Sequence, residues 1–239
     1  MLNEIHLFCA QAALDPECFS LTFISLNIIL GLMAQKMRDL VRQGYDKGKY
    51  EKYYDRESSR LDPLDKLMCD ELVSRLKKNP KILDLGCGTG LPYDKYFVNR
   101  GIGLTGVDIS EKHVGLARKN VRKAKYLVGD FFSEKVKGKF DAIVSFFAIF
   151  HIPRREHKRL LNHIYSLLKK EGYILITLGA EPMRNEINPD FVGAPMAWSS
   201  YSVEHNKRLV SKAGFEILLA VEDYRTERHL WILAKKVGA

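Results

Sequence analysis

Short apolar runs alternate with amphipathic stretches from residue 81 to the end of the chain. Apolar runs bounded by turn residues are typical of buried strands, and strands that alternate with helical stretches are typical of parallel sheets. Seven strands are predicted on this basis: Lys81–Leu85, Gly103–Asp108, Ala124–Val128, Asp141–Phe146, Tyr173–Leu178, Phe215–Tyr224 and His229–Lys236. We therefore expect an α/β fold built on a mostly parallel sheet.

The connections between the strands refine this expectation. Arg154–Lys170 carries one apolar stripe at helical spacing, and Gly172 follows where a left-handed residue commonly ends a helix. Only Arg225–Arg228 separates the last two strands, which is too short for a crossover helix. These two strands are therefore predicted to form a hairpin, with the last strand antiparallel to the others.

The beginning of the chain differs from the rest in charge. No Lys or Arg occurs in the first 34 residues, and Cys18–Gln35 is uncharged over a length close to that of a membrane span. Polar residues lower its hydrophobicity, and it lacks the basic segment and cleavage site of a secretory signal. Three interpretations stay open: a helix that packs on the domain, a membrane-associating segment and a dispensable extension. We favour the first and the third.

This change in charge suggests where the main domain begins. We expect an apolar N-terminal extension over residues 1–36 and a single domain over residues 37–239. Within the domain, residues 37–79 are predicted to form a helical cap of two helices around a polar break at Asp55–Pro63. Residues 80–239 are predicted to form the α/β core.

Composition and charge add further limits. Hydrophobic residues make up 46% and charged residues 28% of the 239 residues, which excludes a largely disordered chain. Four scattered cysteines provide neither a disulfide framework nor zinc-site spacing, so we expect a cytoplasmic location and no bound metal.

The net charge of +9 attracts anionic partners, but the basic residues are spread along the chain, which favours a solvated surface over a nucleic-acid site.

A glycine-rich segment follows the first predicted strand, which ends near Asp84. Three glycines stand there in G-x-G-x-G spacing: Gly86, Gly88 and Gly90. Glycine lets the backbone turn sharply and approach a ligand closely because no Cβ intervenes. Dinucleotide-binding loops have the spacing G-x-G-x-x-G and P-loops carry a lysine. Neither feature occurs in this segment, which disfavours nicotinamide cofactors and nucleoside triphosphates.

Acidic residues end the next two strands. Asp108 closes the second strand, where a carboxylate can accept hydrogen bonds from both hydroxyls of a ribose. Asp130 follows the third strand, where a carboxylate can accept from an exocyclic amine while Phe131 packs against a purine ring. Because the carboxyl ends of parallel strands meet at one edge, the three turns together predict an adenosine-binding site.

With these motifs the chain resembles the class I S-adenosylmethionine-dependent methyltransferases from about Met37 to the C-terminus. Three further runs are similar to a branch of small, uncharacterised bacterial and archaeal methyltransferases: Phe140–Arg154, Leu167–Gly179 and Gly193–Ser200. The resemblance implies a Rossmann-like, doubly wound sheet with strand order 3-2-1-4-5-7-6 and S-adenosylmethionine as cofactor. It also implies a set of cofactor-binding residues: Asp84, Gly86, Cys87, Gly88, Asp108, Ile109, His113, Asp130, Phe131, Ser145 and Phe146.

In this assignment each strand end holds a different part of the cofactor. Residues of the glycine loop would line the methionine and ribose parts, with Asp84 helping to hold the ammonium group. Residues after the second strand would bind the ribose and adenine, and those after the third strand the adenine amine. Residues at the end of the fourth strand would touch the methionine part through their backbone.

One residue is a candidate for accepting a proton from the acceptor. His151 lies just past the fourth strand, where a neutral imidazole could accept a proton near pH 7. The alternative is that this histidine only orients the loop before Ile152 and Pro153, and both interpretations stay open. The insertion Pro182–Tyr201 is rich in Met and aromatic residues and is predicted either as a lid over a small acceptor or as a satellite core.

DNA is excluded as an acceptor by two features of the sequence. The end of the fourth strand, Ser145–Ala148, lacks the Asn or Asp followed by two prolines that is usual in methyltransferases acting on base amines. Neither Cys69 nor Cys87 lies where a cytosine-methylating nucleophile is expected. Small molecules therefore remain the favoured acceptors.

The predicted function is transfer of a methyl group from S-adenosylmethionine to an O or N atom of a small molecule by in-line displacement. An RNA or protein methyltransferase that uses the basic surface is the alternative. An NAD-dependent oxidoreductase and a non-catalytic cofactor-binding module are less favoured. Membrane contact by residues 18–35 is also less favoured, and the acceptor atom and the oligomeric state stay open.

Overall fold

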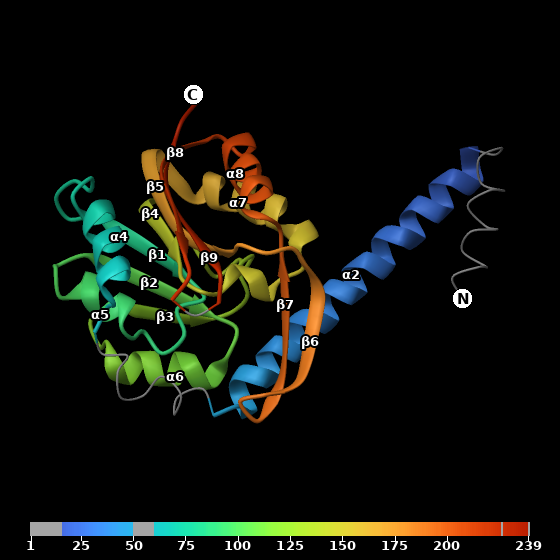
Figure 1. The fold of residues 1–239 in the computed structure, drawn as a ribbon, viewed down its shortest axis with the longest axis horizontal. Helices are drawn as coiled ribbons and strands as arrows, with labels where there is room; N and C mark the ends of the chain where they lie inside the picture. The colour runs from blue at the N-terminus through green and yellow to red at the C-terminus, as the bar shows by residue number, and fades with distance from the viewer. Residues whose placement is uncertain (1–15, 50–59, 226, 239) are drawn as a thin grey trace.

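A seven-stranded sheet forms the centre of the computed structural model (Figure 1). The structure describes residues 16–49, 60–225 and 227–238, with the backbone alone described for 16–27. The strands of the sheet are β1 (Lys81–Leu85), β2 (Gly103–Asp108), β3 (Lys125–Val128), β4 (Phe140–Ser145), β5 (Leu168–Gly179), β8 (Phe215–Asp223) and β9 (His229–Lys236). The observed bounds of β1, β2 and β9 equal the predicted ones, and those of β3, β4 and β8 differ by one residue, whereas β5 begins five residues earlier than predicted.

The order of the strands is β3-β2-β1-β4-β5-β9-β8. Strands β1 to β5 pair in parallel, whereas β9 runs antiparallel to both β5 and β8. The sixth and seventh strands of this sheet are β8 and β9, so the observed order confirms the predicted order 3-2-1-4-5-7-6. The carboxyl ends of β1, β2, β3 and β4 consequently lie together at one edge.

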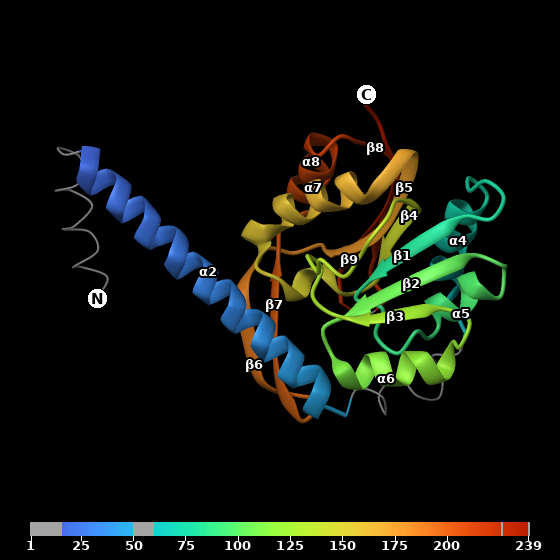
Figure 2. The same cartoon turned by 180° about the vertical axis from the view of Figure 1, so that it is seen from behind.

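Helices cover both faces of the sheet (Figure 2). One face packs against α4 (Pro63–Val73), α5 (Tyr93–Val98) and α6 (Glu111–Asn120). The other face packs against α7 (His157–Leu167) and α8 (Val203–Lys212). Two short turns, η2 (Ile149–His151) and η3 (Arg154–Glu156), connect β4 to α7. The sheet therefore separates two apolar cores, as expected for a doubly wound fold.

The helix predicted over Arg154–Lys170 is shorter than expected. It ends at Leu167, and Leu168 already belongs to β5, where it pairs with Phe140. Leu168 extends the apolar stripe because it is buried in the same core, although it lies on a strand. The left-handed conformation falls on Glu171, with φ of 62°, so the predicted helix end at Gly172 is wrong.

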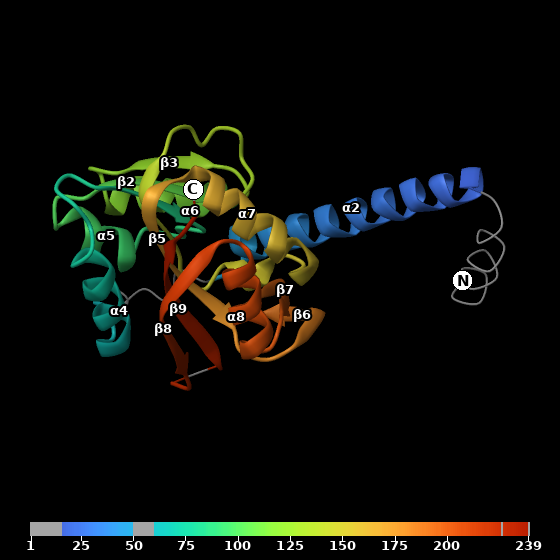
Figure 3. The same cartoon turned by 90° about the horizontal axis from the view of Figure 1, so that it is seen from above.

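The insertion Pro182–Tyr201 forms a hairpin that the sequence pattern did not predict. Its strands are β6 (Met183–Phe191) and β7 (Ala194–Ser200), which pair antiparallel in a separate two-stranded sheet. Seen from above, this hairpin lies beside helix α2 (Pro16–Lys47) (Figure 3). Met196 of β7 is buried against α2, so this part of the insertion forms a satellite core.

Helix α2 attaches to the hairpin along one face. Ala34, Met37, Val41 and Gly44 are buried at a spacing of three or four residues, which places them on a single side of the helix. Helix and strand approach so closely at Gly44 that a Cβ there would lie 2.5 Å from the Pro195 carbonyl oxygen. The second half of α2 is thereby fixed beside the carboxyl edge of the sheet.

Helix α2 runs without a break through residues 36 and 37. The predicted boundary between an extension and the main domain falls inside this helix, and the division into domains stays a prediction. Residues 1–15 and 50–59, which include part of the predicted cap, lie outside the described residues. Among the helices of the described part, none combines the length and the hydropathy needed to cross a bilayer.

Candidate functional site

A cavity lies at the carboxyl edge of the sheet, between the ends of β1 to β4 and helix α2. Each of these elements contributes part of the wall. The lining residues are Arg38, Val41 and Tyr45 from α2, Gly86 after β1, Asp108 and Ile109 after β2, Gly129, Asp130 and Phe131 after β3, and Ala148, His151 and Ile152 after β4. The cavity thus combines the predicted adenosine-binding turns with a wall from α2.

The glycine loop after β1 is held against the end of β2. The backbone N–H groups of Gly86 and Cys87 both donate to the Val107 carbonyl oxygen, at 2.7 and 3.1 Å. Gly86 has φ of 84°, and a Cβ on it would lie 2.4 Å from the Ala148 Cβ. Only glycine fits this position, because any side chain would clash with the loop after β4 and occupy the floor of the cavity.

Asp108 is buried at the end of β2 and faces the cavity. Its Oδ1 accepts from the Ser110 N–H and its Oδ2 from the Gly88 N–H, both at 2.9 Å. Burial raises the pKa of this carboxyl, whereas the two backbone donors stabilise its ionised form. Each carboxylate oxygen has two lone pairs, so both oxygens can accept a further hydrogen bond from a ligand.

Asp130 and Arg38 lie close to each other in the wall of the cavity. Asp130 Oδ1 accepts from the Phe132 N–H at 3.0 Å, and its Oδ2 lies 3.8 Å from Arg38 Nε. Arg38 also donates from Nη1 to Glu156 at 2.9 Å. These contacts join α2 to the loop after β3 and to η3, so the helix is tied to both sides of the cavity.

His151 and Tyr45 form a hydrogen-bonded pair in the cavity wall. His151 Nδ1 lies 2.8 Å from the Ala197 carbonyl oxygen, which can only accept, so Nδ1 carries the proton. Nε2 is therefore the acceptor for the Tyr45 hydroxyl at 2.8 Å. Burial lowers the pKa of His151 from 6.5 to about 4. The imidazole is neutral at physiological pH and is a weak base.

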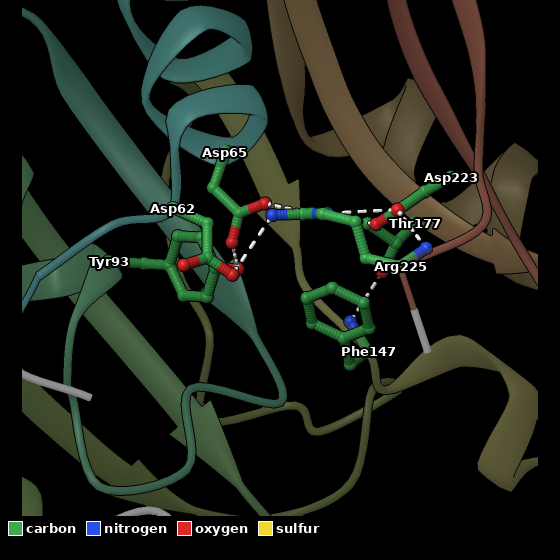
Figure 4. A network of polar contacts seen from close by, with 7 residues as sticks. All are labelled: Asp62, Asp65, Tyr93, Phe147, Thr177, Asp223 and Arg225. Atoms are coloured by element: carbon green, nitrogen blue, oxygen red, sulfur yellow. Dashed lines mark hydrogen bonds and ion pairs between the residues drawn. The ribbon is translucent and has the colours of Figure 1, made fainter. Parts of the chain in front are cut away.

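A second polar network lies at the same edge of the sheet, between the β8–β9 turn and α4 (Figure 4). The Arg225 guanidinium lies between Asp65 and Asp223, with N–O distances of 2.5 and 2.7 Å. Asp62 accepts from the same guanidinium at 2.9 Å, and the Tyr93 hydroxyl donates to Asp65 at 2.6 Å. This network connects the turn after β8 to the beginning of α4 and of α5.

A family model described as a methyltransferase domain matches residues 82–172, which contain the glycine loop and β1 to β4. Residues 82–172 are therefore similar to the methyltransferase domain family, and they include the first four strands of the sheet. It is 30% identical to a ubiquinone biosynthesis O-methyltransferase of Dechloromonas aromatica over 51% of this chain and 53% of that protein. It is 28% identical to a sterol 24-C-methyltransferase of Gibberella zeae over 66% of this chain and 46% of that protein. The chain therefore matches only about half the length of these relatives.

Solved structures support the same fold. The magnesium protoporphyrin IX methyltransferase of Synechocystis, crystallised with bound S-adenosylmethionine, superimposes with a TM-score of 0.63. Its sequence is 18% identical, and the alignment covers 84% of this chain and 97% of that one. At this identity the comparison establishes the fold and leaves the chemistry to the residues of the site.

Half of the candidate residues line the cavity at the carboxyl edge of the sheet, and the others do not. Gly86, Asp108, Ile109, Asp130 and Phe131 line it together with the candidate base His151. The remaining candidates are absent from its wall: Asp84, Cys87, Gly88, His113, Ser145 and Phe146. The roles assigned to individual residues stay predictions.

Four of these remaining candidates have structural contacts instead. The Ser145 hydroxyl donates to the Leu85 carbonyl oxygen at 2.6 Å, and the Phe146 ring stacks on Tyr93 with ring centres 3.9 Å apart. The Cys87 side chain is buried beneath the loop, which raises the pKa of its thiol. The ring of His113 lies 5.0 Å from that of Tyr45, centre to centre, behind the cavity wall.

Asp84 belongs to a buried acidic pair beneath the glycine loop. Burial and the adjacent carboxyl of Asp94 raise the pKa of Asp84, and burial raises the pKa of Asp94 to about 7. The Tyr126 hydroxyl donates to Asp94 Oδ2 at 2.8 Å. Two adjacent buried carboxyls cannot both ionise readily, so the pair retains a proton. Asp84 thus supports the loop from below and carries less negative charge than a free carboxylate.

Sequence reasoning missed the wall that α2 contributes. Arg38, Val41 and Tyr45 are far from the glycine loop in the sequence, and no motif marks them. One signal was available: Met37, Val41 and Gly44 recur at helical spacing and predict a buried helix face. This spacing indicates that one face of α2 is buried. It does not indicate that the helix lies beside the carboxyl edge of the sheet.

We expect His151 to stay neutral between pH 5 and pH 8. Its pKa of about 4 lies below the ordinary 6.5, so the folded protein takes up no proton there as the pH falls through 6.5. The unfolded chain does take one up, so this histidine makes the free energy of unfolding decrease between pH 6.5 and about 4. NMR of the imidazole nitrogens should show the Nδ1-protonated tautomer throughout, with the signal assigned by its absence in His151→Gln. If the His151 imidazole titrates near pH 6.5, it is not buried as the structure places it.

Proposed function

We propose that the protein transfers a methyl group from S-adenosylmethionine to an oxygen or nitrogen atom of a small molecule. The observation that carries the proposal is Asp108, which keeps free acceptor positions on both carboxylate oxygens at the edge of the cavity. The fit of the cofactor is supported by Gly86, where a Cβ would fill the space beside Ala148. Two relatives, named as a ubiquinone biosynthesis O-methyltransferase and a sterol 24-C-methyltransferase, favour a small organic acceptor.

The residues of the cavity provide binding and orientation. Asp108 would hold the ribose hydroxyls, and Asp130 would accept from the adenine amine while Phe131 and Ile109 pack against the ring. When bound, the cofactor supplies an electrophilic methyl group on a sulfonium. The chain has to align the acceptor in line with that methyl group, and alignment alone can lower the barrier by about 7 to 11 kcal/mol.

His151 would act through Tyr45. With a pKa of about 4 the imidazole is a weak base, so it cannot serve as a general base tuned to neutral pH. Its Nε2 instead fixes the direction of the Tyr45 hydroxyl, whose oxygen can accept a hydrogen bond from an O–H or N–H of the acceptor. In this role His151 orients the site, because its Nε2 accepts a hydrogen bond from the Tyr45 hydroxyl without taking its proton.

Titration calorimetry tests the cofactor before any acceptor is known. We expect S-adenosylhomocysteine and S-adenosylmethionine each to bind with one-to-one stoichiometry, because the adenosine contacts are common to both. NAD should bind at least about 100-fold more weakly, since the loop lacks the glycine spacing that brings a helix N-terminus to a pyrophosphate. Binding of NAD alone, or of none of the three, would refute the proposed function.

A further inference from the structure

The outer part of α2 exposes a group of large apolar side chains. Four of them, Ile28, Ile29, Leu32 and Met33, are 53–66% exposed and lie on two successive turns. The other exposed large apolar residues of the described part belong to other segments of the chain: Leu67, Ile187, Tyr224 and Val237. We call the group of four the apolar tip of α2. Exposed apolar groups of this kind mark sites of interaction.

The apolar tip lies where α2 leaves the body of the protein. The first buried side chain of α2 in the described part is Ala34, one residue after the tip, and packing against the hairpin follows from Met37 on. In Figures 1 and 2 the helix N-terminal to this point projects away from the sheet and its covering helices. A flat surface outside the protein can therefore reach the tip without displacing any element of the body.

Among the described residues, the charged side chains near the apolar tip that lack an acidic partner are basic. Between residues 18 and 37 the only charged residue is Lys36, which is exposed. The exposed Arg155 of η3 donates to the Leu30 carbonyl oxygen, and the exposed Lys158 follows in the first turn of α7. The acidic residues nearby are already paired, Glu156 with Arg38 and Asp39 with Arg42. Further along the helix toward its N-terminus the next acidic residue is Glu17.

We propose that the apolar tip docks this protein on the surface of a bilayer that contains anionic phospholipids. Apolar side chains enter the boundary between headgroups and acyl chains, while adjacent Lys and Arg side chains bind the phosphates. A second copy of the chain is the less suitable occupant, because a symmetric contact between two tips would bring the same basic residues together. The insertion is shallow and does not span the bilayer. The proposal concerns α2 alone and is independent of the proposed methyl transfer.

Vesicle sedimentation tests this proposal with the full chain. We expect the wild type to co-sediment with vesicles of phosphatidylcholine and phosphatidylglycerol, and to bind pure phosphatidylcholine less strongly. Added salt should weaken the binding, because it screens the attraction between basic side chains and phosphates. Replacing all four tip residues by Gln, which keeps helix propensity, should weaken binding at least about 100-fold, since each apolar side chain removed from the bilayer contributes 10-fold or more.

A matched pair of single variants provides the control. Leu32 and Leu67 are both exposed leucines on helices, at 66% and 55%. Leu32→Gln should weaken vesicle binding about 10-fold and Leu67→Gln should leave it unchanged. Circular dichroism and S-adenosylhomocysteine binding confirm that each variant is folded.

Two results would overturn the proposal. The first is vesicle binding that is equal for the wild type and the variant with four Gln residues, or absent from both. The second is a wild-type dimer in light scattering that becomes monomeric in the four-residue variant, without vesicle binding by either protein. In that case the apolar tip is an interface between copies of this chain.

Discussion

We expect Asp108→Ala to lower the affinity for S-adenosylhomocysteine by at least about 100-fold. A hydrogen bond to a charged acceptor contributes about 1.5 to 3 kcal/mol, and the substitution removes the acceptor for two ribose hydroxyls. It also leaves the Gly88 and Ser110 N–H groups without the carboxylate that holds them at 2.9 Å. The glycine loop and the beginning of α6 therefore lose their common anchor. Titration calorimetry with S-adenosylhomocysteine measures the loss.

Asp141→Ala is the matched control for this variant. Asp141 is a carboxylate on β4 that accepts from the Lys81 N–H and from Lys169, at the opposite edge of the sheet. Its removal should lower thermal stability but leave the affinity for S-adenosylhomocysteine within a factor of about two. Equal affinities of the wild type and Asp108→Ala, in protein that is folded, would show that Asp108 does not bind the ribose.

We expect Arg225→Met to decrease the free energy of unfolding by about 2 to 3 kcal/mol. The substitution leaves Asp223 and Asp65, whose side chains are 4% and 9% exposed, without their cation. Removing one partner of a fully buried ion pair costs about 3 to 5 kcal/mol, and the guanidinium here is partly solvated, which reduces the cost. Chemical denaturation at pH 7 measures the difference between variant and wild type.

The pH dependence provides a second measure of this network. Arg225 lowers the pKa of Asp223 from 3.8 to about 2, so the stabilisation is fully present above pH 4 and is lost as the pH falls toward 2. The stability difference between wild type and Arg225→Met should therefore narrow below pH 4. Arg228 lies on the same turn and pairs with Glu181 and Glu222, so Arg228→Met is the control and should change stability little. A loss as large in Arg228→Met as in Arg225→Met would contradict the role of the Figure 4 network.

The sheet and the turns of the site could be predicted because their signals are local. The apolar run before Asp84, the glycines after it and the aspartate that ends β2 are each recognisable within a few residues. Four residues between the last two strands suffice to predict an antiparallel hairpin. The parallel order then brings these turns to one edge, which is why Gly86, Asp108 and Asp130 meet as expected.

The remaining features depend on contacts between distant segments. β6 is almost entirely exposed, so its residues show no alternation of apolar and polar positions, and the hairpin could not be recognised. The Tyr45–His151 contact joins residues 106 positions apart, and the Arg225–Asp65 contact joins residues 160 positions apart. Such pairs have no signature in a single sequence, because neither partner constrains the residue types near the other.

Helix α2 is continuous from the apolar tip to the cavity wall, so its length limits the distance between a docked membrane and the cavity. A helix rises 1.5 Å per residue, so Tyr45 in the cavity wall lies about 18 Å along the axis from Met33 at the apolar tip. If the apolar tip lies at the bilayer surface, the cavity is within about 18 Å of the lipid phosphates. An acceptor anchored in the membrane could be methylated only where its reactive group extends above the headgroups on a polar spacer. Acceptors whose reactive group stays within the hydrocarbon would have to leave the bilayer first.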